Sequence, residues 1–374
     1  MNFDLSEEQQ LVSDSIERFV QENYNLDSRI AIVKKSPGYS EEYWKTMSEL
    51  GWLGLPFSED DGGFGGDQID TMVLMEQFGK GLVLEPYLAS IILGGGAIKR
   101  AGNDEQRQAW LEGVIDGSKQ LALAYAEPES GDEPHNVALA GSKTGDGYTL
   151  TGTKCMVLHG GTATAFVVSF RTSGGTVDQS GITLALIPAD REGLSIQAFP
   201  TVDGLQSSEL TFDKVAVTAA DIIGDVDGGF ETLNATINDG ILAVAAEAVG
   251  AMEVLYKDTV AYTQDREQFD HPLSDFQVLQ HRMVEMFMEY EQCKSLLFRA
   301  TMEVASNGDD AQRCVHALKH LIGKASFFVG ENAVQTHGGM GVTEELRVGH
   351  YFKRLLVIEA QFGNTDYHLD QFAA

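Results

Sequence analysis

Residues Leu279 to Val304 read LQHRMVEMFMEYEQCKSLLFRATMEV, and this stretch decides the fold class of the C-terminal part of the chain. Its apolar side chains recur at alternating intervals of four and three residues. The row consists of Leu279, Met283, Met286, Tyr290, Cys293, Leu297, Ala300 and Val304. Such a repeat of about 3.5 residues keeps one helix face toward a partner over roughly seven turns, and it predicts a left-handed helical bundle. We interpret the row as packed core.

The first 118 or so residues also have a helical pattern. Ser6 followed by Gln9 is a capping-box signature, and an apolar row on one helical face comes after it. The row consists of Leu11, Val12, Ile16, Phe19 and Val20.

Glycines divide this N-terminal region further. A Gly- and Asp-rich loop over 58–67 precedes an amphipathic run over 69–78. We expect the glycines at 94–96 and Gly102 to break the helices that follow.

The pattern changes near Gln120, where short segments rich in β-branched residues alternate with Gly and Asp. These segments are 149–154, 165–170, 182–188, 194–199 and 209–217. Their regular spacing predicts a compact antiparallel barrel or sandwich. The helical period returns near Phe230. We therefore predict a mainly α protein with a central β-domain, divided into an N-terminal helical domain (1–118), a β-barrel domain (119–227) and a C-terminal helical bundle (228–374).

The charge balance argues against several functions. The chain has 374 residues, with 26 basic and 56 acidic side chains and a net charge of −30. Such a surface repels phosphate backbones and anionic lipids, so we expect neither nucleic-acid binding nor membrane insertion. No apolar run reaches the ~20 residues of a membrane span. An anionic ligand would need a local cluster of donors.

Targeting and metal signals are weak. The acidic start Met1–Asp4 does not resemble a signal peptide, and the three cysteines form no disulfide framework. Both features favour a cytoplasmic protein. His316 and His320 have a helical spacing suited to a metal, but no third ligand accompanies them, so we expect no metal site.

Four motifs occur in order along the chain, and together they resemble the acyl-CoA dehydrogenase family over essentially its whole length. They are Ala124-Tyr-Ala-Glu-Pro128, Gly152-Thr-Lys154 through His159-Gly-Gly161, Tyr262 through Arg266 and Phe269 to Gln277, and Gln335-Thr-His-Gly-Gly-Met-Gly341. The stretch 350–366 is most similar to the small subunits of pimeloyl-CoA-type members.

This resemblance implies a fold and a reaction. Members have a helical domain, a small β-barrel and a C-terminal four-helix bundle. They desaturate an acyl-CoA thioester between Cα and Cβ, with a carboxylate as base and FAD as hydride acceptor. They form tetramers in which each FAD lies across a subunit interface, and electron-transfer flavoprotein reoxidises them.

The residues that match the family's grip on the ADP half of FAD are present. Arg266 offers a permanent positive charge for the pyrophosphate, with Phe269 and Gln277 at the family spacing. Gln335 is a neighbouring donor. Gly338 and Gly339 allow a close approach of the backbone to the ligand. Pairing of Arg266 with Asp265 or Glu267 is the alternative.

The flavin-ring side departs from the family. The positions where members use Thr fall on Ala126 and Leu158, and the position of a stacking Trp falls on Met156. Tyr125 belongs to the same matched segment. Alanine and leucine side chains cannot donate a hydrogen bond to the ring, so this half of the pocket is degraded.

Both positions of the catalytic base lack a carboxylate. The usual glutamate position falls on Phe362 and the alternative one on Gly240. Asp239 is the nearest candidate for a relocated base. General-base catalysis contributes about 10²–10⁴-fold, so we predict no catalytic residue in this chain.

Four hypotheses follow. The first is a base-less subunit that contributes ADP-side contacts to a homologous partner in an α₂β₂ heterotetramer. The second is a self-sufficient homotetramer that uses Asp239. The third is a scaffold subunit that binds no flavin, and the fourth is a relative that passes electrons to oxygen.

Overall fold

The computed structural model describes residues 5–374, so the start Met1–Asp4 lies outside the described residues. The chain divides into two compact units, each assembled from segments far apart in the sequence. The bundle unit comprises Met1–Ala31, Asp67–Val83 and Ile241–Ala374, and the sheet unit comprises Ile32–Gly66 and Leu84–Gly240. We describe each unit separately.

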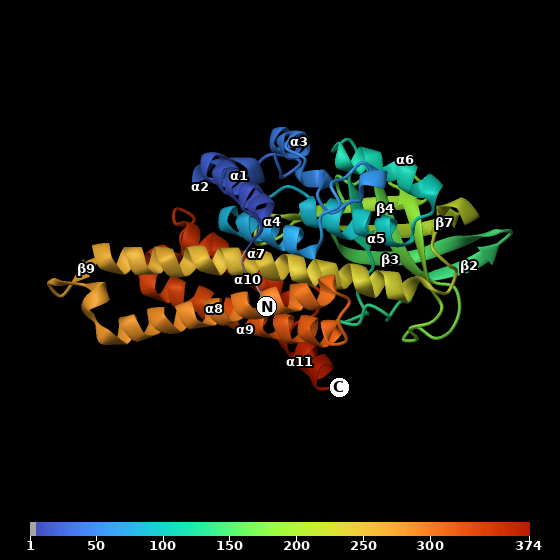
Figure 1. Ribbon diagram of the computed structural model, residues 1–374. Helices are drawn as coiled ribbons and strands as arrows, with labels where there is room; N and C mark the ends of the chain where they lie inside the picture. The colour runs from blue at the N-terminus through green and yellow to red at the C-terminus, as the bar shows by residue number, and fades with distance from the viewer. Residues whose placement is uncertain (1–4) are drawn as a thin grey trace. The chain divides into compact units, whose positions relative to one another are not determined.

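Helices make up the bundle unit (Figure 1). They are α1 (Glu7–Asn23), α2 (Leu26–Val33, whose last two residues belong to the sheet unit), α4 (Gln68–Gly81), α7 (Gly229–Asp265, which begins in the sheet unit), α8 (Gln277–Ala305), α9 (Ala311–His337), α10 (Arg347–Ala360) and α11 (Thr365–Ala373). Short 3₁₀ turns are η5 (Leu273–Asp275) and η6 (Gly338–Val342), and β9 (Glu267–Gln268) pairs with β10 (His271–Pro272). The capping box at Ser6 and Gln9 is confirmed, since each side chain bonds the other's backbone N–H.

The four long C-terminal helices pack together as the apolar row predicts. Helices α8 and α9 lie side by side, and α10 packs on α9. Tyr256 of α7 contacts the Tyr290 ring of α8, with ring centroids 5.2 Å apart. Five members of the row are fully buried, and the other three are partly buried. The fully buried ones are Met286, Tyr290, Cys293, Leu297 and Ala300.

Helix α4 differs from the amphipathic helix that the sequence predicts, because all residues from Met72 to Gly79 are buried. The helix is enclosed by α1, α7 and α8. Its Gly79 meets α7 so closely that an added Cβ would lie 2.0 Å from the Glu247 carbonyl oxygen. Gly250 of α7 approaches Glu76 in the same way, at 1.9 Å. Two glycines thus let the helix backbones touch.

The sheet unit contains one eight-stranded sheet and several short helices. The helical elements are α3 (Glu41–Glu49), η1 (Trp52–Gly54), η2 (Glu59–Asp61), η3 (Leu88–Gly95), α5 (Gly96–Ala101), α6 (Asp104–Ile115) and η4 (Ala219–Asp221). The strands are β1 (Leu121–Ala124), β2 (Ala140–Thr144), β3 (Gly147–Leu158), β4 (Ala165–Arg171), β5 (Ile182–Pro188), β6 (Leu194–Pro200), β7 (Gln206–Val217) and β8 (Ile222–Ile223).

The strands follow the order β6-β7-β3-β2-β4-β5-β8, with β1 added in parallel to β4. All five predicted segments are strands, and most pairs are antiparallel. Alternate residues of β1, β3, β4, β5 and β7 meet in one apolar core, as expected for a small barrel. Phe166, Phe170 and Phe212 are the largest side chains in it.

The glycines at 94–96 do not break a helix. They lie in a continuous helical segment in which the π-helical η3 runs into α5, and only Gly102 ends it. The reason is packing, since a Cβ on Gly94 would lie 2.4 Å from Leu121 Cβ, and one on Gly95 would lie 2.7 Å from the Phe57 ring. These glycines permit close contact with β1 and with Phe57, which lies between η1 and η2.

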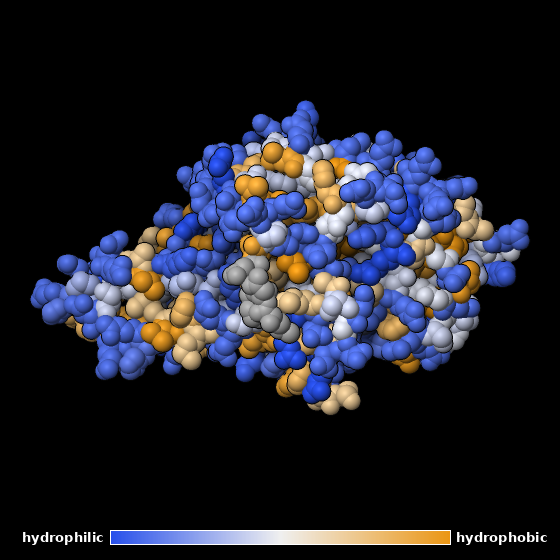
Figure 2. Space-filling model, in the orientation of Figure 1, coloured by the Kyte–Doolittle hydropathy of each residue, from blue (hydrophilic) through white to orange (hydrophobic). Residues whose placement is uncertain are grey.

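Hydrophilic side chains dominate the face in Figure 2, as the net charge of −30 implies. Within residues 5–374, no helix combines the length and apolar character needed to cross a bilayer.

Candidate functional site

A tight hairpin follows helix α7 and presents the first group of candidate residues. Phe269 and Asp270 form its turn with φ of +56° and +63°, between β9 and β10. Phe269 is 84% exposed, and its ring lies edge-on to the Phe276 ring with centroids 6.3 Å apart. An exposed aromatic in a left-handed conformation is unfavourable in an isolated chain.

Arg266 lies at the base of this hairpin and is exposed. Its backbone is held at both ends, because its N–H donates to the Tyr262 carbonyl (2.9 Å) and its carbonyl accepts from the Leu273 N–H (2.8 Å). Within residues 5–374, its guanidinium forms no ion pair and no side-chain hydrogen bond. The alternative pairing with Asp265 or Glu267 is therefore absent from the structure.

Gln277 is the first residue of α8, and its side chain is exposed. The N-cap residue is Phe276, which offers no side-chain acceptor to the first turn. A helix N-terminus of this kind carries a partial positive charge and free N–H groups. It suits a phosphate group next to Arg266.

The end of helix α9 presents the second group. Gln335 is exposed in its last turn, and Gly338 follows the helix with φ of +60°. A Cβ on Gly338 or Gly339 would meet no atom within 4 Å. The positive φ explains glycine at 338, but neither conformation nor packing within the described chain explains it at 339.

The two groups are adjacent within the bundle unit. The Tyr262 ring, one turn before Arg266, stacks on the His337 ring, just before Gly338, with centroids 4.3 Å apart. The structure therefore brings an unpaired guanidinium and two unobstructed glycines to the same end of the bundle. These features fit the pyrophosphate and adenosine end of FAD. The guanidinium supplies positive charge, and the glycines leave room for a close approach.

The matched ring-side residues lie in the sheet unit. Tyr125, Ala126 and Leu158 are half-buried, and Met156 is exposed with φ of +52° in a bulge of β3. The Cys155 N–H donates to the Ala126 carbonyl at 2.9 Å, which ties the two matched segments together. None of these four side chains except Tyr125 can donate a hydrogen bond, so the structure retains the shape of the segment without the side-chain donors expected for a flavin ring.

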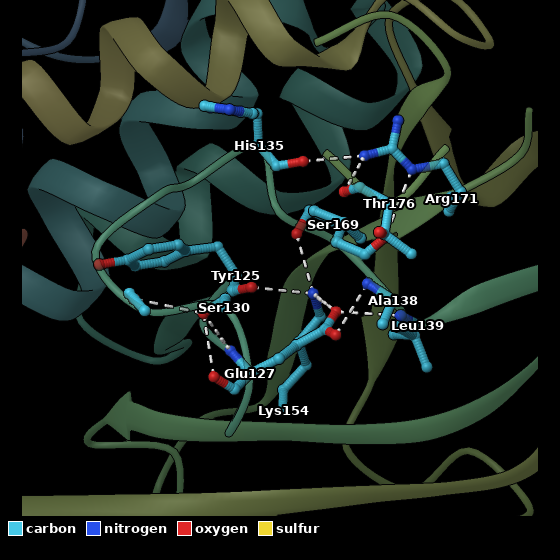
Figure 3. A network of polar contacts seen from close by, with 12 residues as sticks. Tyr125, Glu127, Ser130, His135, Ala138, Leu139, Lys154, Ser169, Arg171 and Thr176 are labelled. Atoms are coloured by element: carbon cyan, nitrogen blue, oxygen red, sulfur yellow. Dashed lines mark hydrogen bonds and ion pairs between the residues drawn. The ribbon is translucent and has the colours of Figure 1, made fainter. Parts of the chain in front are cut away.

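A fully buried lysine holds this segment in place (Figure 3). Lys154 Nζ donates to Glu127 Oε1 (2.7 Å), the Tyr125 carbonyl (2.9 Å) and Ser169 Oγ (3.1 Å). Glu127 also accepts from the backbone N–H groups of 138 and 139. Burial lowers the pKa of Lys154 to about 8, and the Glu127 charge opposes this shift.

The sequence analysis includes Lys154 only within a matched motif and does not identify Arg171. Arg171 is buried and donates to five backbone carbonyls of the loops that follow β1 and β4. Figure 3 shows its guanidinium among those carbonyls. The signal that could have identified Arg171 is a basic residue at the end of a mostly apolar strand, because a buried guanidinium needs hydrogen-bond partners.

The usual base position, Phe362, lies in the turn between α10 and α11 and is buried with φ of +60°. Buried Lys319 of α9 donates to the carbonyls of Glu359 and Gly363, each at 2.8 Å. His368 Nε2 bonds the Phe362 carbonyl at 2.9 Å. The turn is held by these hydrogen bonds, and it places a buried aromatic ring at the position predicted for the base.

The alternative base position and its neighbour lie in the sheet unit. Gly240 is buried in α7, and Asp239 forms an ion pair with Arg100 of α5. The Arg100 guanidinium engages Asp239 Oδ2, so this carboxylate already has a charged partner within the chain.

The histidines with metal-like spacing are used in hydrogen bonds. His316 Nδ1 contacts His368 Nδ1 at 2.9 Å, and His320 Nδ1 contacts the Thr365 carbonyl at 3.0 Å. Burial lowers the pKa of His316. These side chains brace α11 against α9.

Comparisons with known proteins identify the family of this chain. Models of the N-terminal, middle and C-terminal domains of acyl-CoA dehydrogenases match residues 6–118, 122–215 and 227–374. The probable acyl-CoA dehydrogenase YngJ of Bacillus subtilis is 28% identical over 371 residues, which cover 98% of this chain and 97% of that protein.

Two solved structures are similar over the full length of this chain. A chain of the ChsE4–ChsE5 complex from Mycobacterium tuberculosis has a TM-score of 0.91 and 26% identity, and the match covers 100% of this chain and 98% of that one. The FAD complex of PigA has a TM-score of 0.92 and 25% identity, with coverage of 100% and 98%.

Proposed function

The chain belongs to the acyl-CoA dehydrogenase family of FAD-dependent oxidoreductases, and on that premise we propose that it is the base-less subunit of an α₂β₂ heterotetramer. In this assembly a homologous subunit carries the base and the complete ring pocket. This chain contributes the ADP-side contacts to that subunit's FAD. The substrate is an acyl-CoA thioester, and electron-transfer flavoprotein takes up the electrons.

The observation that carries the proposal is the contrast between Arg266 and Phe362. Arg266 is exposed and has no partner within residues 5–374, although the chain has 30 more acidic than basic side chains. Phe362, at the position that the family resemblance matches to the base, has a buried aromatic ring. A chain that holds a nucleotide but cannot remove an α-proton is of use mainly to a partner that can.

Each residue has a defined task in the proposed complex. Arg266 and the N-terminus of α8 bind the pyrophosphate, and Gln335 donates a hydrogen bond beside it. Gly339 allows the adenosine end to approach the backbone. The chemistry that FAD supplies when bound is acceptance of the hydride that leaves the acyl Cβ.

The proposal is tested by stoichiometry. We expect the complex with a base-bearing homologous subunit to be a tetramer with about one flavin per two chains. Native mass and flavin absorbance measure both quantities. Full flavin content and turnover in a homomer of this chain alone would contradict the proposal.

The role of Arg266 is tested in the same complex. Arg266→Ala removes a charge-assisted contact and should weaken flavin retention by roughly 10- to 100-fold. The matched control is Arg18→Ala, which removes another exposed arginine of the bundle unit, on α1. Equal flavin retention in the two variants would remove the assigned role.

The structure gives less support to the self-sufficient homotetramer. Its base would be Asp239, which the Arg100 ion pair already engages. Under that alternative, the purified homomer turns over an acyl-CoA, and Asp239→Asn abolishes this turnover. We expect instead that the unmodified homomer shows no turnover.

A further inference from the structure

Two exposed segments of the bundle unit meet at a pair of stacked rings. All residues over 264–271, in the hairpin after α7, are exposed, and so are the residues over 338–340 after α9. Tyr262 and His337 come just before these segments, and Tyr262 is half-buried while His337 is buried. Their ring centroids lie 4.3 Å apart at an interplanar angle of 31°. The stack therefore joins the two segments where each becomes exposed.

Backbone hydrogen bonds connect each ring to the segment that follows it. His337 Nδ1 lies 2.8 Å from the Ala333 carbonyl oxygen, and Nδ1 carries the proton because a carbonyl only accepts. This bond ties the imidazole to the preceding turn of α9, and Gly338 follows directly. The Tyr262 carbonyl accepts from the Arg266 N–H at 2.9 Å. The position of the two rings therefore sets the positions of Arg266 and Gly338.

The residue next to Tyr262 holds the hairpin to a different helix. Thr263 is buried, and its hydroxyl lies 2.8 Å from the Val260 carbonyl and 3.2 Å from Met283 Sδ of α8. Thr263 thus sets the start of the hairpin against α8, whereas Tyr262 sets it against the end of α9. The two contacts fix the hairpin in different directions.

A fixed separation of the two segments matters because one ligand has to reach both. The pyrophosphate and the adenosine of a dinucleotide are joined covalently, so the groups that bind them must be held at a matching distance. Side chains behind a site that hold it in the binding geometry reduce the ordering cost of binding. A stacked aromatic pair is suited to this task, since it is stabilising beyond the area it buries and has a preferred geometry.

We propose that Tyr262 and His337 are positioning residues, which hold the Arg266 hairpin and the turn at Gly338 and Gly339 as one preformed site for the ADP half of FAD. The rings act through the groups that they hold and need no contact with the ligand. The inference rests on the proposed function, because that function supplies the ligand. It adds that the two segments bind the ligand as a unit.

The first test compares two tyrosines of α7 in the complex with a base-bearing homologous subunit. Tyr262→Leu removes the stack and should weaken flavin retention, measured by absorbance after dialysis, by about 3- to 10-fold. The matched control is Tyr256→Leu, because Tyr256 lies earlier in the same helix and contacts the Tyr290 ring at 5.2 Å. The control should lower Tm as Tyr262→Leu does but leave flavin retention unchanged. Equal flavin loss in the two variants would overturn the inference.

The second test asks whether the ring itself is required. Tyr262→Phe keeps the stack and should retain flavin within about twofold of the wild type. His337→Leu should weaken retention as Tyr262→Leu does, since either change removes the stack. A loss in Tyr262→Phe as large as that in Tyr262→Leu would overturn the inference.

The third test measures whether Tyr262 acts through Arg266. If it does, Tyr262→Leu should weaken flavin retention less in the Arg266→Ala background than in the wild type, because the group that it positions is already gone. A change in Tm lowers retention equally in both backgrounds. Purely additive effects would therefore contradict the positioning role.

The outcomes distinguish this inference from the proposed function. If Arg266→Ala retains flavin as well as Arg18→Ala does, the proposed function and the inference both fail. If Arg266→Ala loses flavin while Tyr262→Leu retains it, the hairpin binds the cofactor without help from the stack. In that case the positioning inference alone fails.

Discussion

Two segments at helix ends of the bundle unit have opposite hydrogen-bonding character. The hairpin after α7 leaves the Arg266 guanidinium without a partner and exposes Phe269. The turn after α10 has its carbonyls bonded by buried Lys319 and His368. The difference teaches that, within residues 5–374, the turn at Phe362 has its hydrogen bonds completed by the chain itself, whereas the Arg266 hairpin offers groups that only another molecule can bind.

The ring-side segment of the sheet unit resembles the satisfied turn. Lys154 and Glu127 find their hydrogen-bond partners within the chain, as Lys319 does in the other unit. In both places a buried lysine holds backbone that the family resemblance predicts to lie near the reacting atoms. Under the proposed function, the chain keeps this supporting framework without the groups that act on the substrate.

The largest expected effect on stability comes from removing the hydrogen bonds that Lys154 donates within the chain. Lys154→Met leaves the Glu127 charge buried without its cation and should lower the free energy of unfolding by about 3–5 kcal/mol. Urea unfolding measures it, and Lys143→Met on the neighbouring strand β2, where the lysine is exposed, is the control. Similar losses in the two variants would show that the buried pair has no special role.

The second effect concerns pH and the turn at Phe362. Burial, with the Lys319 charge as a further cause, lowers the pKa of His368 to about 3 in the folded state, from an ordinary value of 6.5. The unfolded chain therefore takes up this proton first as the pH falls. Stability is complete above about pH 6.5 and should decrease toward pH 3 by about 1.4 kcal/mol per unit, up to about 4 kcal/mol.

Unfolding midpoints between pH 7 and pH 4 test this expectation. His368→Gln should flatten the dependence, whereas His281→Gln, at an exposed histidine of α8, should leave it unchanged. A wild-type slope that survives in His368→Gln would assign the acid sensitivity to another group.

The third effect restores a carboxylate at the base position. Phe362→Glu places a polar group in a buried site and should cost about 1–3 kcal/mol of stability. We expect no turnover from the chain alone, because Ala126 and Leu158 still offer no side-chain donors to a flavin ring. Turnover of an acyl-CoA by this variant would contradict the expectation that the ring-side residues prevent catalysis by the chain alone.

The smallest effect on stability is expected at the open glycine. Gly339→Ala meets no atom within 4 Å and should change the free energy of unfolding by less than about 1 kcal/mol, yet lower flavin retention in the complex. Gly338→Ala is the control for backbone strain, because its φ of +60° disfavours a side chain. Unaltered flavin retention in Gly339→Ala would show that no ligand approaches this backbone.

The sequence alone determined the element types and the identity of the missing groups. A 3.5-residue apolar row specifies a helix and its buried side, and β-branched segments between Gly and Asp specify strands, because these signals are local. The absence of a carboxylate at Phe362 and Gly240 follows from matched positions and needs no coordinates.

Only the tertiary structure decided which groups are satisfied. Helix α4 is buried on all sides because Gly79 and Gly250 let α7 come close. The sequence of α4 contains no pattern that predicts contact with α7. In the same way, the Arg266 side chain has no partner in the part of the chain that the structure describes, whereas Asp239 has one, from a helix more than a hundred residues away. Hydrogen bonding and burial depend on contacts between distant segments, and these form only when the chain has folded.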